Sequence, residues 1–170
     1  MRLPAEIVIV ALGSNLGDPV ANVRAAIDKL RNFSDRHVVA SSLWKTSPVD
    51  CPPGSPDFVN SIAAFLPRDE ETPFTLLAKF QAIEREFGRG QKQILNEPRP
   101  LDVDLIAFGR QQFQTESLIL PHPRARARRF VLAPLAEIDP DYLFSGESAT
   151  VATILAGLAS GEVIERLGPV

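Results

Sequence analysis

Short apolar runs that alternate with amphipathic segments constrain the fold of this chain most. Residues 6–12 read EIVIVAL, a nearly unbroken β-branched run that is typical of a strand covered on both faces. A glycine-containing turn follows, and Asp18-Pro19 then supplies a helix N-cap and a first helical residue. Apolar residues recur after it at helical spacing, at Val23, Ala26, Ile27 and Leu30. This region therefore predicts a strand, a turn and a helix.

Further apolar runs predict one strand each over residues 37–44, 58–66 and 101–108. A second capped, amphipathic helix is predicted from Pro73 to the turn at Gly88. The order of elements fits a ferredoxin-like β-α-β-β-α-β sandwich. This is an α+β fold with a mostly antiparallel sheet, helices on its faces and extra C-terminal elements.

The segments outside this pattern are two long loops and a mixed tail. Residues 45–57 carry four prolines and one glycine, so the backbone of this first loop is stiff at several points. Residues 89–100 show no helical or strand periodicity of apolar residues, so this segment is predicted to be the second loop.

In the tail, residues 113–120 are expected to be extended, and residues 124–138 to form short helices broken at Pro134. A final helix is predicted over residues 151–158, capped by Thr150.

The composition of the 170 residues excludes several classes of protein. Apolar residues make up 45% and charged residues 23%, which is too apolar for a disordered chain. No apolar run is long enough for a membrane-spanning helix, and the N-terminal run is interpreted as a strand rather than a signal peptide. The one cysteine, Cys51, excludes an internal disulfide and a cysteine-rich zinc site. A cytoplasmic protein is therefore expected.

Two aspartates alternate with apolar residues in the strand predicted at 101–108. Successive strand side chains point to opposite faces, so Asp102 and Asp104 share one face. Two carboxylates so close repel each other unless a cation lies between them. Oxygen ligands of this kind suit Mg²⁺, which completes its shell with water and phosphate oxygens. The alternative is that both aspartates lie on the solvent face of an edge strand.

Arginines surround this pair in the sequence. Guanidinium groups bind phosphate through two parallel hydrogen bonds, so aspartates and arginines together supply the parts needed for transfer from a nucleotide. For the downstream arginines, a solvated helix face or a local nucleic-acid patch is the alternative, although the net charge of −3 argues against a broad nucleic-acid surface. The basic residues around the aspartates are Arg89 and Arg99 upstream, and His122, Arg124, Arg126, Arg128 and Arg129 downstream.

Other motifs carry less information. Gln81 and Glu84 share a helix face, which in isolation indicates a solvated edge. The segment at residues 13–17 lacks the lysine of a phosphate-binding loop. Cys51 lies among prolines, and a tolerated free cysteine is favoured over a reactive thiol.

Five sequence motifs follow one another along the chain. They are ALGSNLG at 11–17, TSP at 46–48 with FVN at 58–60, QAIE at 81–84 with Gly88-Arg89, PRPLDVDL at 98–105 and LPHP at 120–123. In this order they resemble the 6-hydroxymethyl-7,8-dihydropterin pyrophosphokinase family. The resemblance covers residues 7–138 of an expected single catalytic domain, 1–170, and leaves 139–170 as a C-terminal extension.

The resemblance implies transfer of pyrophosphate from ATP to the hydroxymethyl group of a reduced pterin, with release of AMP, in folate biosynthesis. It implies that Asp102 and Asp104 hold two Mg²⁺ ions against the ATP phosphates, and that Arg89 and Arg99 assist catalysis with them. ATP and the pterin are the expected partners, without nucleic acid or membrane, and the chain is expected to be a monomer.

The binding residues are also implied by the resemblance. The residues expected to contact ATP are Gln81, Glu84, Lys92, Leu105, His122 and Arg128. The residues expected to line the pterin pocket are Thr46, Ser47, Val49, Phe58, Asn60, Asn96 and Phe130. A flat heterocycle suits aromatic faces, and its amide-like edge suits the paired donor and acceptor of an asparagine.

The chain departs from the family pattern where Gln91, Leu95 and Ser117 stand in place of common arginines, and Ser47 in place of a common proline. These changes predict altered ATP affinity. The alternatives are another ATP-dependent nucleotidyl- or phosphotransferase, a pterin- or nucleotide-binding module without catalysis, and a nucleic-acid-binding ferredoxin-like domain, which would need exposed aromatic residues on the sheet.

Overall fold

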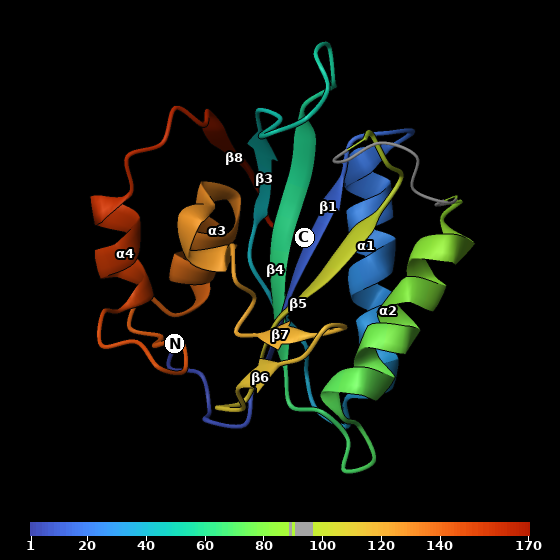
Figure 1. Cartoon of the computed structure of the whole chain (residues 1–170). Coiled ribbons are helices and arrows are strands. Elements are labelled where there is room, and N and C mark those ends of the chain that lie inside the picture. Colours follow the sequence, from blue (N-terminus) through green and yellow to red (C-terminus); the bar gives the residue numbers. More distant parts are fainter. Residues whose placement is uncertain (89, 91–96) are drawn as a thin grey trace.

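The computed structural model describes residues 1–88, 90 and 97–170. Figure 1 shows the arrangement of its elements. The strands are β1 Val8–Ser14, β2 Val39–Ala40, β3 Leu43–Thr46, β4 Phe58–Phe65, β5 Asp102–Phe108, β6 Phe113–Gln114, β7 Ile119–Leu120 and β8 Ile164–Gly168. The helices are α1 Pro19–Leu30, α2 Pro73–Glu86, α3 Arg129–Ile138 and α4 Val151–Gly157, with short 3₁₀ turns at Arg31–Phe33 and Ala125–Ala127.

The main sheet has the strand order β5-β1-β4-β3-β8, with β2 also paired to β4. Every pairing among the described residues is antiparallel. The first strand and the strand after the second helix are therefore neighbours, as the β-α-β-β-α-β order requires. The predicted ferredoxin-like α+β fold is confirmed.

Helices cover both faces of the sheet, α1 and α2 on one and α3 and α4 on the other (Figure 1). Strand β1 shows why, because its residues alternate between two hydrophobic cores. Val8 and Val10 pack with α1 and α2, whereas Ile9 packs with α3. The prediction of a first strand buried on both faces is confirmed.

The prediction of a single strand over residues 37–44 is wrong, because a bulge separates two strands there, β2 and β3. Val39 pairs with Ala64, but Trp44 pairs with Asn60, so one extra residue lies between the two pairs. Ser42 lies at this bulge and is not paired with a residue of β4. Its backbone N–H lies 3.2 Å from both carboxylate oxygens of Glu137 on α3, and its hydroxyl donates at 2.7 Å. Trp44 Nε1 and the Arg166 guanidinium donate to the same carboxylate.

Of the three predictions for the tail, one is wrong, one is confirmed and one needs refinement. Helix α3 runs through Pro134 without a break, because its buried apolar face packs against the sheet strongly enough to offset one missing hydrogen bond. Helix α4 begins after the Thr150 cap as predicted, but it is followed by the unpredicted strand β8. The extended segment at 113–120 is a hairpin of β6 and β7. Among the described helices, none has the length and apolar character to cross a membrane.

Candidate active site

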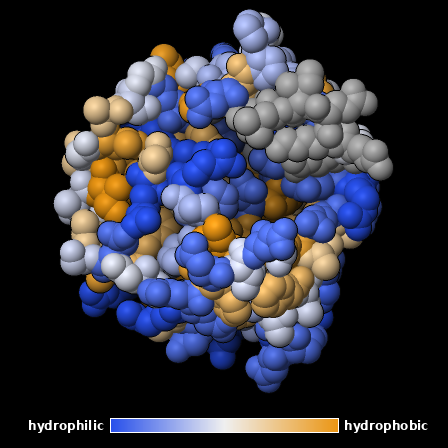
Figure 2. Space-filling view, viewed as in Figure 1, coloured by the Kyte–Doolittle hydropathy of each residue, from blue (hydrophilic) through white to orange (hydrophobic). Residues whose placement is uncertain are grey.

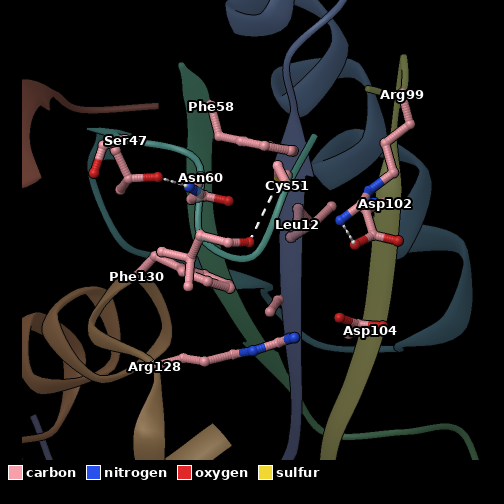
Figure 3. A pocket seen from close by; sticks show the side chains of 14 residues that line it. Leu12, Ser47, Cys51, Phe58, Asn60, Arg99, Asp102, Asp104, Arg128 and Phe130 are labelled. Carbon is pink, nitrogen blue, oxygen red and sulfur yellow. Dashed lines mark hydrogen bonds and ion pairs between the residues drawn. The ribbon is translucent and has the colours of Figure 1, made fainter. Parts of the chain in front are cut away.

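A pocket lies on the α3 face of the sheet, where β1 ends between β4 and β5. In the space-filling view a hollow with an apolar interior is ringed by hydrophilic residues (Figure 2). Side chains from the sheet, the loop after β3 and the start of α3 converge on it (Figure 3). Its lining is Ala11, Leu12, Gly13, Thr46, Ser47, Val49, Cys51, Phe58, Asn60, Arg99, Asp102, Asp104, Arg128 and Phe130.

Three strands present one row of residues to this pocket. Gly13 on β1 is paired with Asn60 on β4 and with Asp102 on β5. In the next row Ala11 is paired with Asp104. Since neighbouring strands are spaced by about 4.8 Å, the backbones of Asn60 and Asp102 lie roughly 10 Å apart. The sheet register therefore fixes an amide and a carboxylate on either side of a residue that has no side chain.

Asn60 is buried and its amide is oriented by its neighbours. Its Nδ2 donates to Thr46 Oγ1 at 2.7 Å. A Cβ atom at Gly13 would lie only 2.7 Å from Asn60 Oδ1, so any larger residue there would displace the amide. Phe58 from β4 and Phe130 from α3 lie on either side of Asn60 (Figure 3). The arrangement offers aromatic surfaces around a fixed donor and acceptor.

Asp102 and Asp104 share one face of β5, as predicted from their spacing. Both line the pocket and are partly exposed, whereas Val103 between them is buried in the core on the α1 and α2 side. Arg99 Nη2 forms an ion pair with Asp102 Oδ2 at 3.0 Å, and the Arg99 guanidinium lies 5.4 Å from the centre of the Phe58 ring. Arg99 therefore links the carboxylate side of the pocket to its aromatic side (Figure 3).

The backbone of Arg99 is fixed by Asn15, which directly follows β1. Asn15 Oδ1 accepts from the Arg99 N–H at 2.8 Å, and the Asn15 N–H donates to the Arg99 carbonyl at 3.2 Å. Asn15 Nδ2 donates to the carbonyl of Pro56, in the loop after β3. This buried side chain thus ties two loops at the pocket together. Its position in the ALGSNLG motif was the only sequence signal for it.

Arg128 adds positive charge near the aspartates, and His122 lies close to the same pair. The His122 N–H donates to the Ile106 carbonyl at 2.8 Å, which places His122 at the outer edge of β5. Burial, with Arg128 and Arg124 nearby, lowers the pKa of His122 to about 4, so this imidazole is neutral at pH 7. Arg128 reaches from the start of α3 toward the side of the pocket that carries Asp104 (Figure 3).

The two aspartates fit a divalent cation that takes most of its ligands from elsewhere. Within the described parts of the chain, no group of three or more histidine, cysteine, aspartate or glutamate side chains is arranged to hold a metal. A protein cage that completes the coordination shell is therefore not present there. Mg²⁺ requires no such cage, because it binds through one or two carboxylates together with water and phosphate oxygens.

Several residues predicted as ATP contacts lie away from this pocket. Gln81 is exposed on α2. Glu84 is buried and accepts a hydrogen bond from the Val103 N–H at 2.8 Å, between α2 and β5. The Leu105 side chain packs in the core on the α1 and α2 side. The predicted residues Arg89, Lys92 and Asn96 lie outside the described residues.

The structure also brings in residues that sequence reasoning did not assign. Ala11, Leu12, Gly13 and Cys51 line the pocket together with Thr46, Ser47, Val49, Phe58, Asn60 and Phe130, the predicted pterin residues that the structure describes. Burial raises the pKa of the Cys51 thiol, which favours its neutral form. That agrees with the interpretation of Cys51 as a tolerated free cysteine.

Comparison with known proteins decides the family. The model of the 7,8-dihydro-6-hydroxymethylpterin-pyrophosphokinase (HPPK) family matches residues 9–140. The chain belongs to the HPPK family. The 2-amino-4-hydroxy-6-hydroxymethyldihydropteridine pyrophosphokinase of Haemophilus influenzae is 39% identical over 94% of this chain and 97% of its own length. The enzyme of that name from Pseudomonas aeruginosa is 41% identical over 79% of this chain and 81% of its own.

Solved HPPK structures share the fold. A crystal structure of an HPPK-DHPS in complex with substrates superposes with a TM-score of 0.71 at 12% identity. The match covers 91% of this chain but only 43% of that longer chain. The likeness supports the ferredoxin-like architecture, and the chain spans less than half the length of this bifunctional relative.

Proposed function

We propose that this pocket is the active site at which the chain, as a member of the HPPK family, transfers pyrophosphate from ATP to 6-hydroxymethyl-7,8-dihydropterin. The products are the pterin diphosphate and AMP, in folate biosynthesis. The observation that carries the assignment is the row Asn60, Gly13 and Asp102. It puts the backbone of the asparagine with the oriented amide roughly 10 Å from the backbone of the aspartate, a span that suits a small flat heterocycle with its reacting group toward β5.

The pterin end of the pocket is the side formed by Thr46, Ser47, Val49, Phe58, Asn60 and Phe130. The rings of Phe58 and Phe130 supply flat apolar surfaces for a fused heterocycle. Asn60 gives one N–H to Thr46 and directs its carbonyl oxygen toward Gly13, so its amide meets a ligand in one orientation. An amide held in this way matches the donor and acceptor pattern of a pterin edge.

The phosphate end is the side formed by Arg99, Asp102, Asp104 and Arg128. In the proposal Asp102 and Asp104 hold Mg²⁺, which when bound neutralises negative charge on the ATP phosphates. Arg99 and Arg128 bind phosphate oxygens from the two sides of the pocket. Their cationic groups favour the transition state, in which negative charge spreads over the transferred group.

The chemical step in this proposal is an in-line attack of the pterin hydroxyl on the β-phosphorus of ATP, with AMP as the leaving group. The protein supplies position and charge rather than a covalent intermediate. Other features remain predictions. They are the number of Mg²⁺ ions, the monomeric state, the single-domain organisation, the cytoplasmic location and the ATP roles of Gln81, Glu84, Lys92, Leu105 and His122.

Product analysis tests the proposal. The purified chain with ATP, Mg²⁺ and 6-hydroxymethyl-7,8-dihydropterin is expected to form AMP and pterin diphosphate in equal amounts. Formation of ADP would exclude this reaction and indicate another phosphotransferase. Calorimetry with a non-hydrolysable ATP analogue distinguishes an enzyme from a binding module without catalysis. A binding module would bind the analogue but would form no product in the assay with ATP.

A further inference from the structure

The C-terminal segment, residues 158–170, lies beyond the stretch matched by the family model, yet it contacts the pocket walls. It runs from α4 past α3 to β8, which lies beside β3 (Figure 1). Thr46 pairs with Ile164 at the end of β3. One residue further, the Ser47 N–H donates to the Val163 carbonyl at 3.0 Å, and the Val163 N–H donates to Ser47 Oγ at 3.1 Å. Val163 thus holds Ser47, a pocket residue, by two hydrogen bonds.

The residue before Val163 holds the opposite wall. Glu162 Oε2 accepts from the Arg129 N–H at 3.0 Å, and Glu162 Oε1 accepts from the Phe130 N–H at 3.1 Å. These are the first two amides of α3, and such amides have no partner within a helix. Arg128, the N-cap of α3, makes no side-chain capping bond. Glu162 therefore caps α3 from more than thirty positions along the chain.

The capped turn carries two side chains of the pocket. Phe130 supplies an aromatic wall, and the guanidinium of Arg128 lies 5.2 Å from the centre of the Phe130 ring. Consecutive residues 162 and 163 therefore attach α3 and the loop after β3 to the segment that directly precedes β8. Loss of the cap would free the first turn of α3 while Ser47 stayed attached to Val163.

We propose that Glu162 is a positioning residue that sets the distance between Phe130 and the Ser47 side of the pterin pocket. The proposal rests on the pterin role of this pocket. It assigns a task to the C-terminal extension, whose residues contact the pocket walls without lining the pocket. A purely structural role for Glu162 would lower the stability of the fold without selectively changing pterin affinity.

The test compares Glu162→Gln with Glu165→Gln in the full-length chain. Glutamine keeps the length of the side chain but places an NH₂ group against one of the two helix amides and removes the charge. Glu165 is exposed on β8 three positions later and serves as a control of equal charge change. For Glu162→Gln we expect the KM for the pterin to rise about tenfold, with kcat within about threefold of the parent. Glu165→Gln should leave both constants within about twofold.

Two further measurements keep the outcome decisive. Amide hydrogen exchange of the peptide that covers the start of α3 should accelerate in Glu162→Gln while the midpoint of urea unfolding shifts little. If Glu162→Gln does not fold, Glu162→Asp, which keeps the charge on a shorter side chain, is measured in the same way. An unchanged pterin KM in a folded variant, or equal losses in KM, kcat and unfolding midpoint, would overturn the proposal. Absence of AMP release by the parent would instead reject the pyrophosphokinase assignment, and the exchange measurement would still report on the cap.

Discussion

Gly13 and Asn60 face each other across β1 and β4 so closely that a Cβ atom on Gly13 would lie 2.7 Å from Asn60 Oδ1. Gly13→Ala should therefore turn the Asn60 amide away from its Thr46 contact. We expect the KM for the pterin to rise about tenfold or more, because an oriented polar contact to the substrate is lost. Steady-state kinetics with the pterin varied at saturating ATP measures this effect.

The matched control for that variant is Gly157→Ala at the end of α4, where nothing lies within 4 Å of an added Cβ. It should leave pterin kinetics unchanged. A Gly13→Ala enzyme with the parent KM would show that Asn60 does not depend on the space at Gly13.

Arg99 lies between Asp102 and the Phe58 ring, and it is well buried, with 16% of its side chain exposed. Arg99→Ala should lower kcat on the order of 10²-fold, because a fixed charge that favours the transition state is removed. Arg36→Ala, at an exposed arginine outside the pocket, should stay near the parent. Turnover of Arg99→Ala within about threefold of the parent would reject this role.

Asn15 holds Arg99 through two hydrogen bonds and binds Pro56 through a third. Asn15→Ala removes the acceptor of the Arg99 N–H and the donor to the Pro56 carbonyl, whereas the backbone bond to the Arg99 carbonyl can persist, so we expect a loss of about 2 kcal/mol in the free energy of unfolding. The kcat should also fall, because the Arg99 backbone loses its support. Urea unfolding monitored by circular dichroism, with the exposed Asn32→Ala as control, checks the stability change.

Glu137 connects α3 to the bulge in the sheet and to Arg166. Burial alone would raise the pKa of Glu137, but hydrogen bonds from Ser42, Trp44 and Arg166 outweigh it and hold the pKa below its ordinary value. A carboxylate with a lowered folded-state pKa stabilises the fold above its unfolded-state pKa, and this contribution is lost as the pH falls through the folded-state pKa.

Glu137→Gln should accordingly lower the free energy of unfolding by about 2 kcal/mol at pH 7. The difference from the parent should shrink as the pH falls below about 4. Urea unfolding at a series of pH values measures it. A difference that stays constant from pH 7 to pH 3 would mean that the charge of Glu137 contributes nothing.

The fold was predictable where local patterns and tertiary packing agree. Strand β1, helix α1 and the Asp102 and Asp104 face of β5 follow directly from apolar spacing. The bulge at Ser42 was not predictable, because its stability comes from Glu137, which lies about 95 residues away. Strand β8 is short and largely exposed, so its pairing with β3 rather than its own sequence forms it.

The same difference applies to the site. Residue types and motif order predicted the aspartates, Arg99 and the aromatic residues Phe58 and Phe130, all of which line the pocket. Gly13, Asn15 and Glu162 act through the register of β1 and through contacts with distant segments, which spacing alone does not reveal. Glu84 is a further case, because its spacing on the helix indicated a solvated edge, whereas its carboxylate is buried and accepts a hydrogen bond from the Val103 N–H.

The most direct test is AMP release by Asp102→Asn and Asp104→Asn compared with the parent, in the presence of ATP, Mg²⁺ and 6-hydroxymethyl-7,8-dihydropterin. Both changes keep the shape of the side chain and remove its charge, and Asp35→Asn in an exposed ion pair is the control. We expect each pocket variant to lose turnover on the order of 10²-fold or more while the control retains it. Release of AMP at the parent rate by both pocket variants would contradict the assignment of this pocket as the site of pyrophosphate transfer.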